Sequence, residues 1–174
     1  MKKALRMWAV VGILSVLALT FPADSRPSDD SLIVPGVRIG KATLAMTVPT
    51  LVTTLGEPIT HFEGLPHFGV ESQPGVLALD WTGPVGLGLA TRDDRTVLAL
   101  YTCGAPRYRT ATGVKYASAL GSVESAYGKP TATIPLVIGP AIIYNSVGLA
   151  VRYFRWVECI VVFRPGSARQ IWKF

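Results

Sequence analysis

The most constraining feature of this chain is an internal similarity, because two stretches 72 residues apart carry the same helix-and-stop pattern. Residues 47–55 and 119–127 are each followed by glycine, a charged residue and proline. In the first stretch, apolar residues recur at the spacing of one helical face: Val48, Leu51, Val52 and Leu55. Thr47 can cap its N-terminus, and Gly56 and Pro58 supply the left-handed end and the stop. We therefore predict two short helices here, the second capped by Ser118, whose apolar stripes pack in the core.

The similarity continues into segments that are typical of antiparallel strands. Residues 81–87 and 144–149 each place an aromatic residue and a turn before Val-Gly-Leu. The expected strands are 85–91, 97–103, 149–154, 157–163 and a terminal strand at 167–174, with turns at 93–95 and 155–156. We predict an α+β fold with two tandem repeats, each a short helix packed on an antiparallel β-sheet. Residues 32–104 would form the first half and residues 105–166 the second half of a body spanning 26–166.

The N-terminus has the order of charged, apolar and small residues that is typical of a secretory signal peptide. Lys2, Lys3 and Arg6 precede a 15-residue apolar run, and Pro22 and small residues follow it. The run is shorter than the roughly 20 residues of a membrane-spanning helix. We expect residues 1–25 to be a signal peptide and the body to be periplasmic or extracellular. An uncleaved N-terminal anchor is the alternative, and it would be the protein's one contact with a membrane.

Charge is distributed unevenly along the chain. Removing residues 1–23, which hold three basic residues and no acidic one, lowers the net charge from +6 to +3, and an exported protein of this charge is not expected to bind nucleic acid. Residues 24–103 hold 5 basic and 9 acidic residues, whereas residues 104–174 hold 9 basic and 2 acidic residues. We expect an acidic first half and a basic second half, which could steer a partner.

The two cysteines, Cys103 and Cys159, form no CxxC motif. Cys159 shares strand parity with Val157, Val161 and Phe163, so we expect it to be buried. An oxidising compartment permits a disulfide. The internal alignment, however, places Cys103 at the position equivalent to Phe163 rather than to Cys159. The pairing of the two thiols is therefore left open.

Candidate chemistry is confined to one long loop. His61, Glu63, His67 and Glu71 make an H-x-E-x3-H-x3-E pattern whose side chains zinc accepts, although the spacing matches no established metal motif. A solvated polar loop has the same composition. No nucleophile-and-base pattern and no phosphate-binding glycine motif is present. We therefore assign no catalytic residue, no metal site and no cofactor.

Two places have the residue types that dominate protein interfaces. The long loop, which is about nine residues longer than its counterpart in the second half, carries Phe62 and Phe68. The strand at 149–156 interleaves basic and aromatic residues, among them Arg152, Tyr153 and Trp156. A half-buried strand and a loop tucked against the sheet would look the same in sequence. These five residues are our candidates for protein binding.

The pattern around the first helix resembles a known class of exported bacterial domains. Its elements are Ile-Val-Pro-Gly at 33–36, Leu-Ala-Met-Thr at 44–47 and Leu-Gly-Glu-Pro at 55–58. They are similar to outer-membrane assembly lipoproteins of the SmpA/OmlA type and to tandem-repeat β-lactamase-inhibitor proteins. The resemblance implies a helix laid on an antiparallel sheet, twice. Because the lipoprotein cysteine is absent and Ala45 replaces a glycine of the pattern, neither lipid anchoring nor lactamase inhibition is carried over.

The sequence thus favours an exported, non-enzymatic module that binds a protein or supports envelope assembly. A small metal-dependent or degenerate enzyme using the loop from His61 to Glu71 is the main alternative. A purely structural envelope protein is the third.

Overall fold

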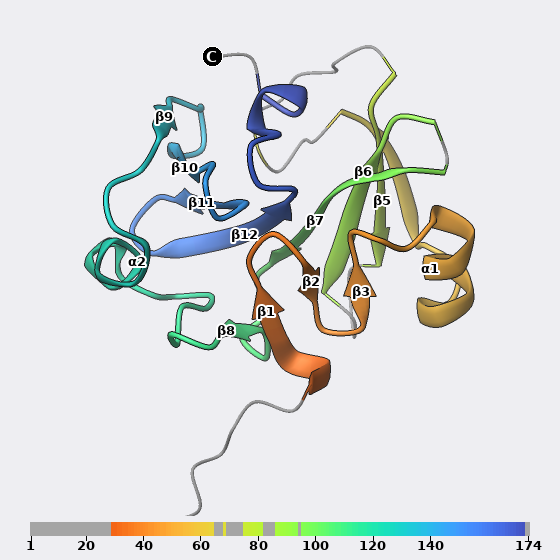
Figure 1. The fold of residues 1–174 in the computed structure, drawn as a ribbon, viewed down its shortest axis with the longest axis horizontal. Coiled ribbons are helices and arrows are strands. Elements are labelled where there is room, and N and C mark those ends of the chain that lie inside the picture. Colours follow the sequence, from red (N-terminus) through yellow and green to blue (C-terminus); the bar gives the residue numbers. More distant parts are fainter. Residues whose placement is uncertain (1–28, 65–67, 69–74, 82–85, 94, 173–174) are drawn as a thin grey trace, which may run out of the picture.

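The computed structural model describes residues 29–64, 68, 75–81, 86–93 and 95–172, which form two sheets, two α-helices and short 3-10 turns (Figure 1). The expected signal peptide lies outside these residues. In chain order the elements are η1 (Asp29–Ser31), β1 (Leu32–Val34), β2 (Arg38–Ile39), β3 (Ala42–Thr43), α1 (Val48–Leu55), β4 (Thr60–Glu63), β5 (Leu77–Trp81), β6 (Leu87–Thr91), β7 (Val97–Cys103), β8 (Arg109–Thr110), α2 (Leu120–Tyr127), β9 (Ala132–Ile134), β10 (Ala141–Tyr144), β11 (Leu149–Tyr153), β12 (Val157–Phe163) and η3 (Ala168–Gln170).

The predicted fold class is wrong, because the protein is mostly β-sheet and its strands are not divided into two helix-on-sheet repeats. One continuous sheet has the order β4-β5-β6-β7-β12-β11-β10-β9, so β7 and β12 pair directly with each other. A second sheet, of order β3-β2-β1-β8, has no counterpart in the prediction. The local pattern could not show the β7–β12 and β1–β8 pairings, since each joins segments far apart in the chain.

The two helices form where they were predicted. In α1 the Thr47 hydroxyl accepts a hydrogen bond from the Thr50 N–H at 3.4 Å, and Gly56 ends the helix at a φ of 88°. In α2 the predicted cap is wrong: Ala119 occupies the N-cap position without a side-chain bond. The Ser118 hydroxyl instead accepts from the Lys115 N–H at 3.0 Å, which closes the turn before the helix.

One face of the large sheet packs against both helices and the small sheet. Val48 and Leu51 of α1, Val123 of α2, and Ile33 and Ile39 of the small sheet join a single buried cluster with the sheet's side chains. The indole N–H of Trp81 on β5 donates to the carbonyl of Gly56 at 2.8 Å, which holds the end of α1 against the sheet. The fully buried side chains fix the position of these elements, because each contributes about 1.5–3 kcal/mol by leaving water.

The other face is covered by the C-terminal segment, which is not the predicted strand at 167–174. Residues 168–170 form the 3-10 helix η3, and Trp172 follows with 2% of its surface exposed. The sheet surface below is lined by small side chains: Ala78, Ala90, Ala99 and Ala150. These alanines leave room for Trp172, whose ring meets Phe68 and Phe163 edge to face at centroid distances of 6.3 and 5.4 Å.

Cys103 and Cys159 form a disulfide across the β7–β12 pair. Cys159 is buried, as predicted, with 1% of its surface exposed. The alignment that matched Cys103 with Phe163 gave no reason to expect the bond. Antiparallel pairing explains it: Ala99 faces Phe163 and Cys103 faces Cys159, so equivalent positions lie at opposite ends of the pair.

Candidate functional site

Exposed apolar side chains gather at two neighbouring turns of the large sheet. Among the described residues, seven large hydrophobic side chains are exposed, and four of them lie in the β9–β10 and β11–β12 turns. They are Val137 at 104% and Ile138 at 46% in the first turn, and Phe154 at 61% and Trp156 at 42% in the second. Large apolar residues that share one exposed surface are uncommon on monomeric proteins and mark interaction sites. We call these four residues and Arg155 the turn cluster.

A glycine allows the two turns to touch. Gly139 has a φ of 97°, and a Cβ at this position would overlap the carbonyl oxygen of Tyr153 and lie 3.2 Å from the Cα of Phe154. The N–H of Tyr153 donates to the carbonyl of Pro140 at 3.0 Å, which extends the β10–β11 pairing to the turns. Any other residue at position 139 would push the two turns apart. Because the backbone of Gly139 contacts the backbone of the β11–β12 turn, the side chains of both turns lie on one continuous surface.

The β11–β12 turn is held in one conformation although its side chains face solvent. The N–H of Phe154 donates to the carbonyl of Trp156 at 3.2 Å, and the hydroxyl of Tyr153 donates to the carbonyl of Arg155 at 3.0 Å. The guanidinium carbon of Arg155 lies 6.0 Å from the centroid of the Phe154 ring. A turn fixed in this way loses little entropy when a partner binds.

The charge of the cluster comes from Arg155. The neighbouring Arg152 is committed to Glu158, to which it donates from Nη2 at 2.9 Å and from Nε at 3.1 Å. Arg155 is exposed and makes no ion pair within the part of the chain that the structure describes. Because residues 104–174 hold 9 basic and 2 acidic residues, the cluster belongs to the cationic half of the protein.

The three residues predicted to bind a partner from the strand at 149–156 differ in their exposure. Trp156 is exposed, as a binding residue needs to be, whereas Arg152 and Tyr153 are half-buried and hold the turn in place. Sequence reasoning missed Val137, Ile138 and Phe154. The available signal was an apolar pair directly before Gly-Pro, since a turn leaves such residues without a sheet face to pack on.

The two phenylalanines of the long loop have different environments. Phe68 is completely buried, with its ring edge to face against Tyr101 and Trp172 at 6.3 Å in both cases. It is core packing, so its assignment to protein binding is wrong. Phe62 is 38% exposed and lies on β4, an edge strand, where the sequence predicted loop. Phe62 therefore stays a candidate binding residue.

The four residues of the metal-dependent alternative are only partly described. His61 and Glu63 lie on β4 and are exposed, whereas His67 and Glu71 lie outside the described residues. Within the described residues, no group of three metal-binding side chains comes together. Both cysteines are used by the disulfide, so neither supplies a thiolate nucleophile.

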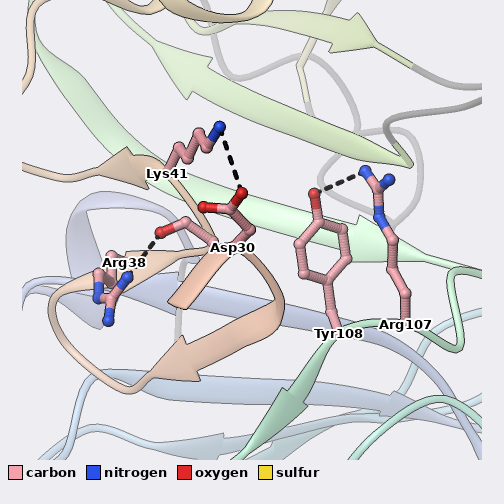
Figure 2. Close-up of polar contacts among 6 residues, drawn as sticks. Asp30, Arg38, Lys41, Arg107 and Tyr108 are labelled. Carbon is pink, nitrogen blue, oxygen red and sulfur yellow. Dashed lines mark hydrogen bonds and ion pairs between the residues drawn. The ribbon is translucent and has the colours of Figure 1, made fainter. Parts of the chain in front are cut away.

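A small hollow lies between the small sheet, the end of α1 and the β7–β8 connection, and Figure 2 shows the polar side chains at its rim. Its volume is about 180 Å³, and Ile39, Leu55 and Leu87 form the apolar part of its lining. At its rim, the Lys41 ammonium pairs with the Asp30 carboxylate at 3.2 Å. Arg107 donates a hydrogen bond from Nη2 to the Tyr108 hydroxyl at 2.8 Å. The guanidinium carbon of Arg107 lies 4.6 Å from the centroid of the Tyr108 ring. Typical small-molecule sites have volumes of about 300–1,000 Å³, so the hollow fits only a very small ligand. Its charged groups are also engaged with one another, which makes the turn cluster the stronger candidate.

A tyrosine and a carboxylate are buried together on the opposite face of the large sheet. Tyr101 and Asp80 are both 2% exposed, on either side of Gly88. Burial, and secondarily the negative charge of Asp80, raises the pKa of the Tyr101 phenol above its usual value of 10.0. A phenol that remains protonated and inaccessible is not suited to acid–base chemistry near neutral pH.

No family model, curated protein or solved structure matches this chain. The resemblance to exported envelope domains therefore stays a prediction. Within the described part of the chain, no helix combines the length and the apolar character that crossing a bilayer requires.

Proposed function

We propose that this protein is an exported, non-enzymatic binding module that docks on another protein through the turn cluster. The observation that carries the proposal is the exposure of four large apolar side chains on two turns that Gly139 brings into contact. Burying Phe154 and Trp156 in a partner would remove large apolar surfaces from water, and few such residues supply most of the energy of a typical interface.

The partner's chemistry follows from the charge around the cluster. Arg155 projects beside the apolar side chains, and the second half of the chain carries an excess of basic residues. A protein surface with an apolar depression and an acidic rim would complement both features.

Two observations support the proposed export. The N-terminal charged and apolar segments are typical of a signal peptide, and the disulfide is a bond that persists in oxidising compartments. Mass spectrometry of the exported protein should show a new N-terminus between residues 21 and 26. Recovery of intact Met1 in the membrane fraction would instead support the uncleaved anchor.

The docking surface is tested by placing a photo-crosslinking amino acid at position 156 in cells that make the protein. We expect a protein adduct of defined mass at this position and none at position 37, where Val37 is similarly exposed in the turn between β1 and β2. Lipid adducts at position 156 without a protein adduct would contradict the proposal and would indicate membrane binding. Equal adducts at both positions would show that contact is non-specific.

Affinity for the identified partner then separates binding from folding. We expect Trp156→Ala combined with Phe154→Ala to weaken binding at least about tenfold, because each removed side chain is an aromatic anchor. The control variant, Val37→Ala combined with Ile59→Ala, removes exposed apolar surface elsewhere and should leave affinity unchanged. Both variants should keep the melting temperature within a few degrees, since the residues changed are largely exposed.

A further inference from the structure

Strand β4 forms one edge of the large sheet and carries exposed side chains at all four of its positions. Its other side pairs with β5 in the register Thr60 to Asp80 and Phe62 to Ala78. An edge strand presents a row of backbone donors and acceptors to any chain that can align with it. The identity of the side chains along the edge decides which chain that is.

The backbone of β4 has a defined orientation. The N–H of Gly64 donates to the carbonyl of Val76 at 2.8 Å, so the backbone groups at position 64 face β5. Because these groups alternate in direction along a strand, those of Phe62 also face β5. The N–H and carbonyl groups of His61 and Glu63 then point away from β5, to the side of β4 on which no other strand of the described residues pairs.

We propose that β4 pairs antiparallel with β4 of a second copy of this chain, about a two-fold axis that passes beside Phe62. In this register, His61 of each copy faces Glu63 of the other. These are the two residues whose backbone groups point outward, so the two copies exchange four backbone hydrogen bonds. The imidazole of each His61 lies opposite a carboxylate, and the two Phe62 rings form a cross-strand aromatic pair on the other face.

The sequence of β4 selects this register over its neighbours. A two-fold axis at position 63 would place two Glu63 carboxylates directly opposite each other, which is destabilising. An axis at position 61 would place two histidines together and set Glu63 against Ile59. Only the axis at Phe62 places His61 opposite Glu63 in both copies. Because the edge is self-complementary in this way, a second copy of the chain fits it as a partner.

The contact is expected to be weak. A strand of four residues buries much less than the roughly 1,200–2,000 Å² of a stable interface. We therefore expect a monomer–dimer equilibrium that shifts with protein concentration, and a covalent trap is the most sensitive readout.

The geometry provides such a trap. In Phe62→Cys the new thiols of two copies would face each other at a non-hydrogen-bonded position, where Cα atoms lie about 4.5 Å apart, within reach of a disulfide. We expect rapid oxidation to a covalent dimer that keeps the native Cys103–Cys159 bond, as peptide mapping would show. Thr133→Cys on β9, the opposite edge of the sheet, is the matched control and should remain monomeric. Equal cross-linking of the two variants, or none of a folded Phe62→Cys variant, would overturn the proposal.

Charge exchange tests the register independently. The variant His61→Glu places like charges opposite each other and should abolish dimers in sedimentation velocity at concentrations where the unaltered protein associates. Adding Glu63→His restores the complementary pair with its members exchanged and should restore association. A double variant that remains monomeric while folded would show that the copies do not pair in this register.

Discussion

Cys103 and Cys159 lie directly opposite each other on β7 and β12, with their sulfurs bonded and their Cα atoms 4.1 Å apart. These two strands are the junction between the strands that follow α1 and those that follow α2. The disulfide therefore fixes the register of the one strand pair that makes the large sheet continuous.

Removing this bond should destabilise the protein substantially. The two cysteines are separated by 56 residues, and closing a loop of this length restricts the unfolded chain by about 4 kcal/mol in the chain-entropy model. We expect the free energy of unfolding of Cys103→Ala with Cys159→Ala to fall by about 2–5 kcal/mol, measured by denaturant titration. Thiol counting under denaturing, non-reducing conditions should find no free thiol in the unaltered protein. Two free thiols would contradict the bond.

Gly88 should not tolerate a side chain. It lies between Asp80 and Tyr101 in the sheet, and a Cβ here would overlap the Tyr101 ring, which is buried and cannot move aside. We expect Gly88→Ala to lower the free energy of unfolding by about 1–3 kcal/mol, as overpacking does. Gly121→Ala is the control: its Cβ would meet nothing within 4 Å, and α2 should gain up to about 1 kcal/mol.

Phe68 and Phe62 should respond differently to truncation. Phe68→Ala empties a buried site between Tyr101 and Trp172 and should cost about 3–5 kcal/mol in the free energy of unfolding. Phe62→Ala, on the exposed edge strand, should change it by about 0.5 kcal/mol at protein concentrations too low for dimers. Thermal and denaturant unfolding of the two variants would measure the difference. Similar losses would show that Phe62 also belongs to the core.

The raised pKa of Tyr101 predicts a loss of stability at alkaline pH. Below about pH 10 the phenol is protonated in both the folded and the unfolded chain, so its contribution is fully present. Above that pH the unfolded chain releases the proton and the folded protein does not, so stability falls by up to about 1.4 kcal/mol per pH unit. Denaturant titrations from pH 8 upward should show a shallower decline for Tyr101→Phe than for the unaltered protein. Identical slopes would mean that another group controls the alkaline transition.

Local sequence was sufficient for the two helices and for two of the hairpins, β6–β7 and β11–β12. Thr47, Gly56 and Pro58 bracket α1 through contacts within one or two turns of chain, and both predicted hairpins formed with their turns in place. These features depend on backbone geometry and on neighbours in the chain, which the sequence displays directly. Of the candidate binding residues, Trp156 was singled out because basic and aromatic residues interleave along residues 149–156, and its side chain is exposed in the structure.

The tertiary structure decided which strands meet and which side chains remain exposed. Pairing of β7 with β12 joined the strands into one sheet and brought Cys103 to Cys159, although no local pattern linked them. Packing of the C-terminal segment buried Phe68, and the close approach of two turns at Gly139 created the turn cluster. Exposure is set by what covers a side chain from elsewhere in the fold. The alternation of residue types along one strand therefore predicts which side chains share a face, and only long-range contacts determine which of those faces remains open to a partner.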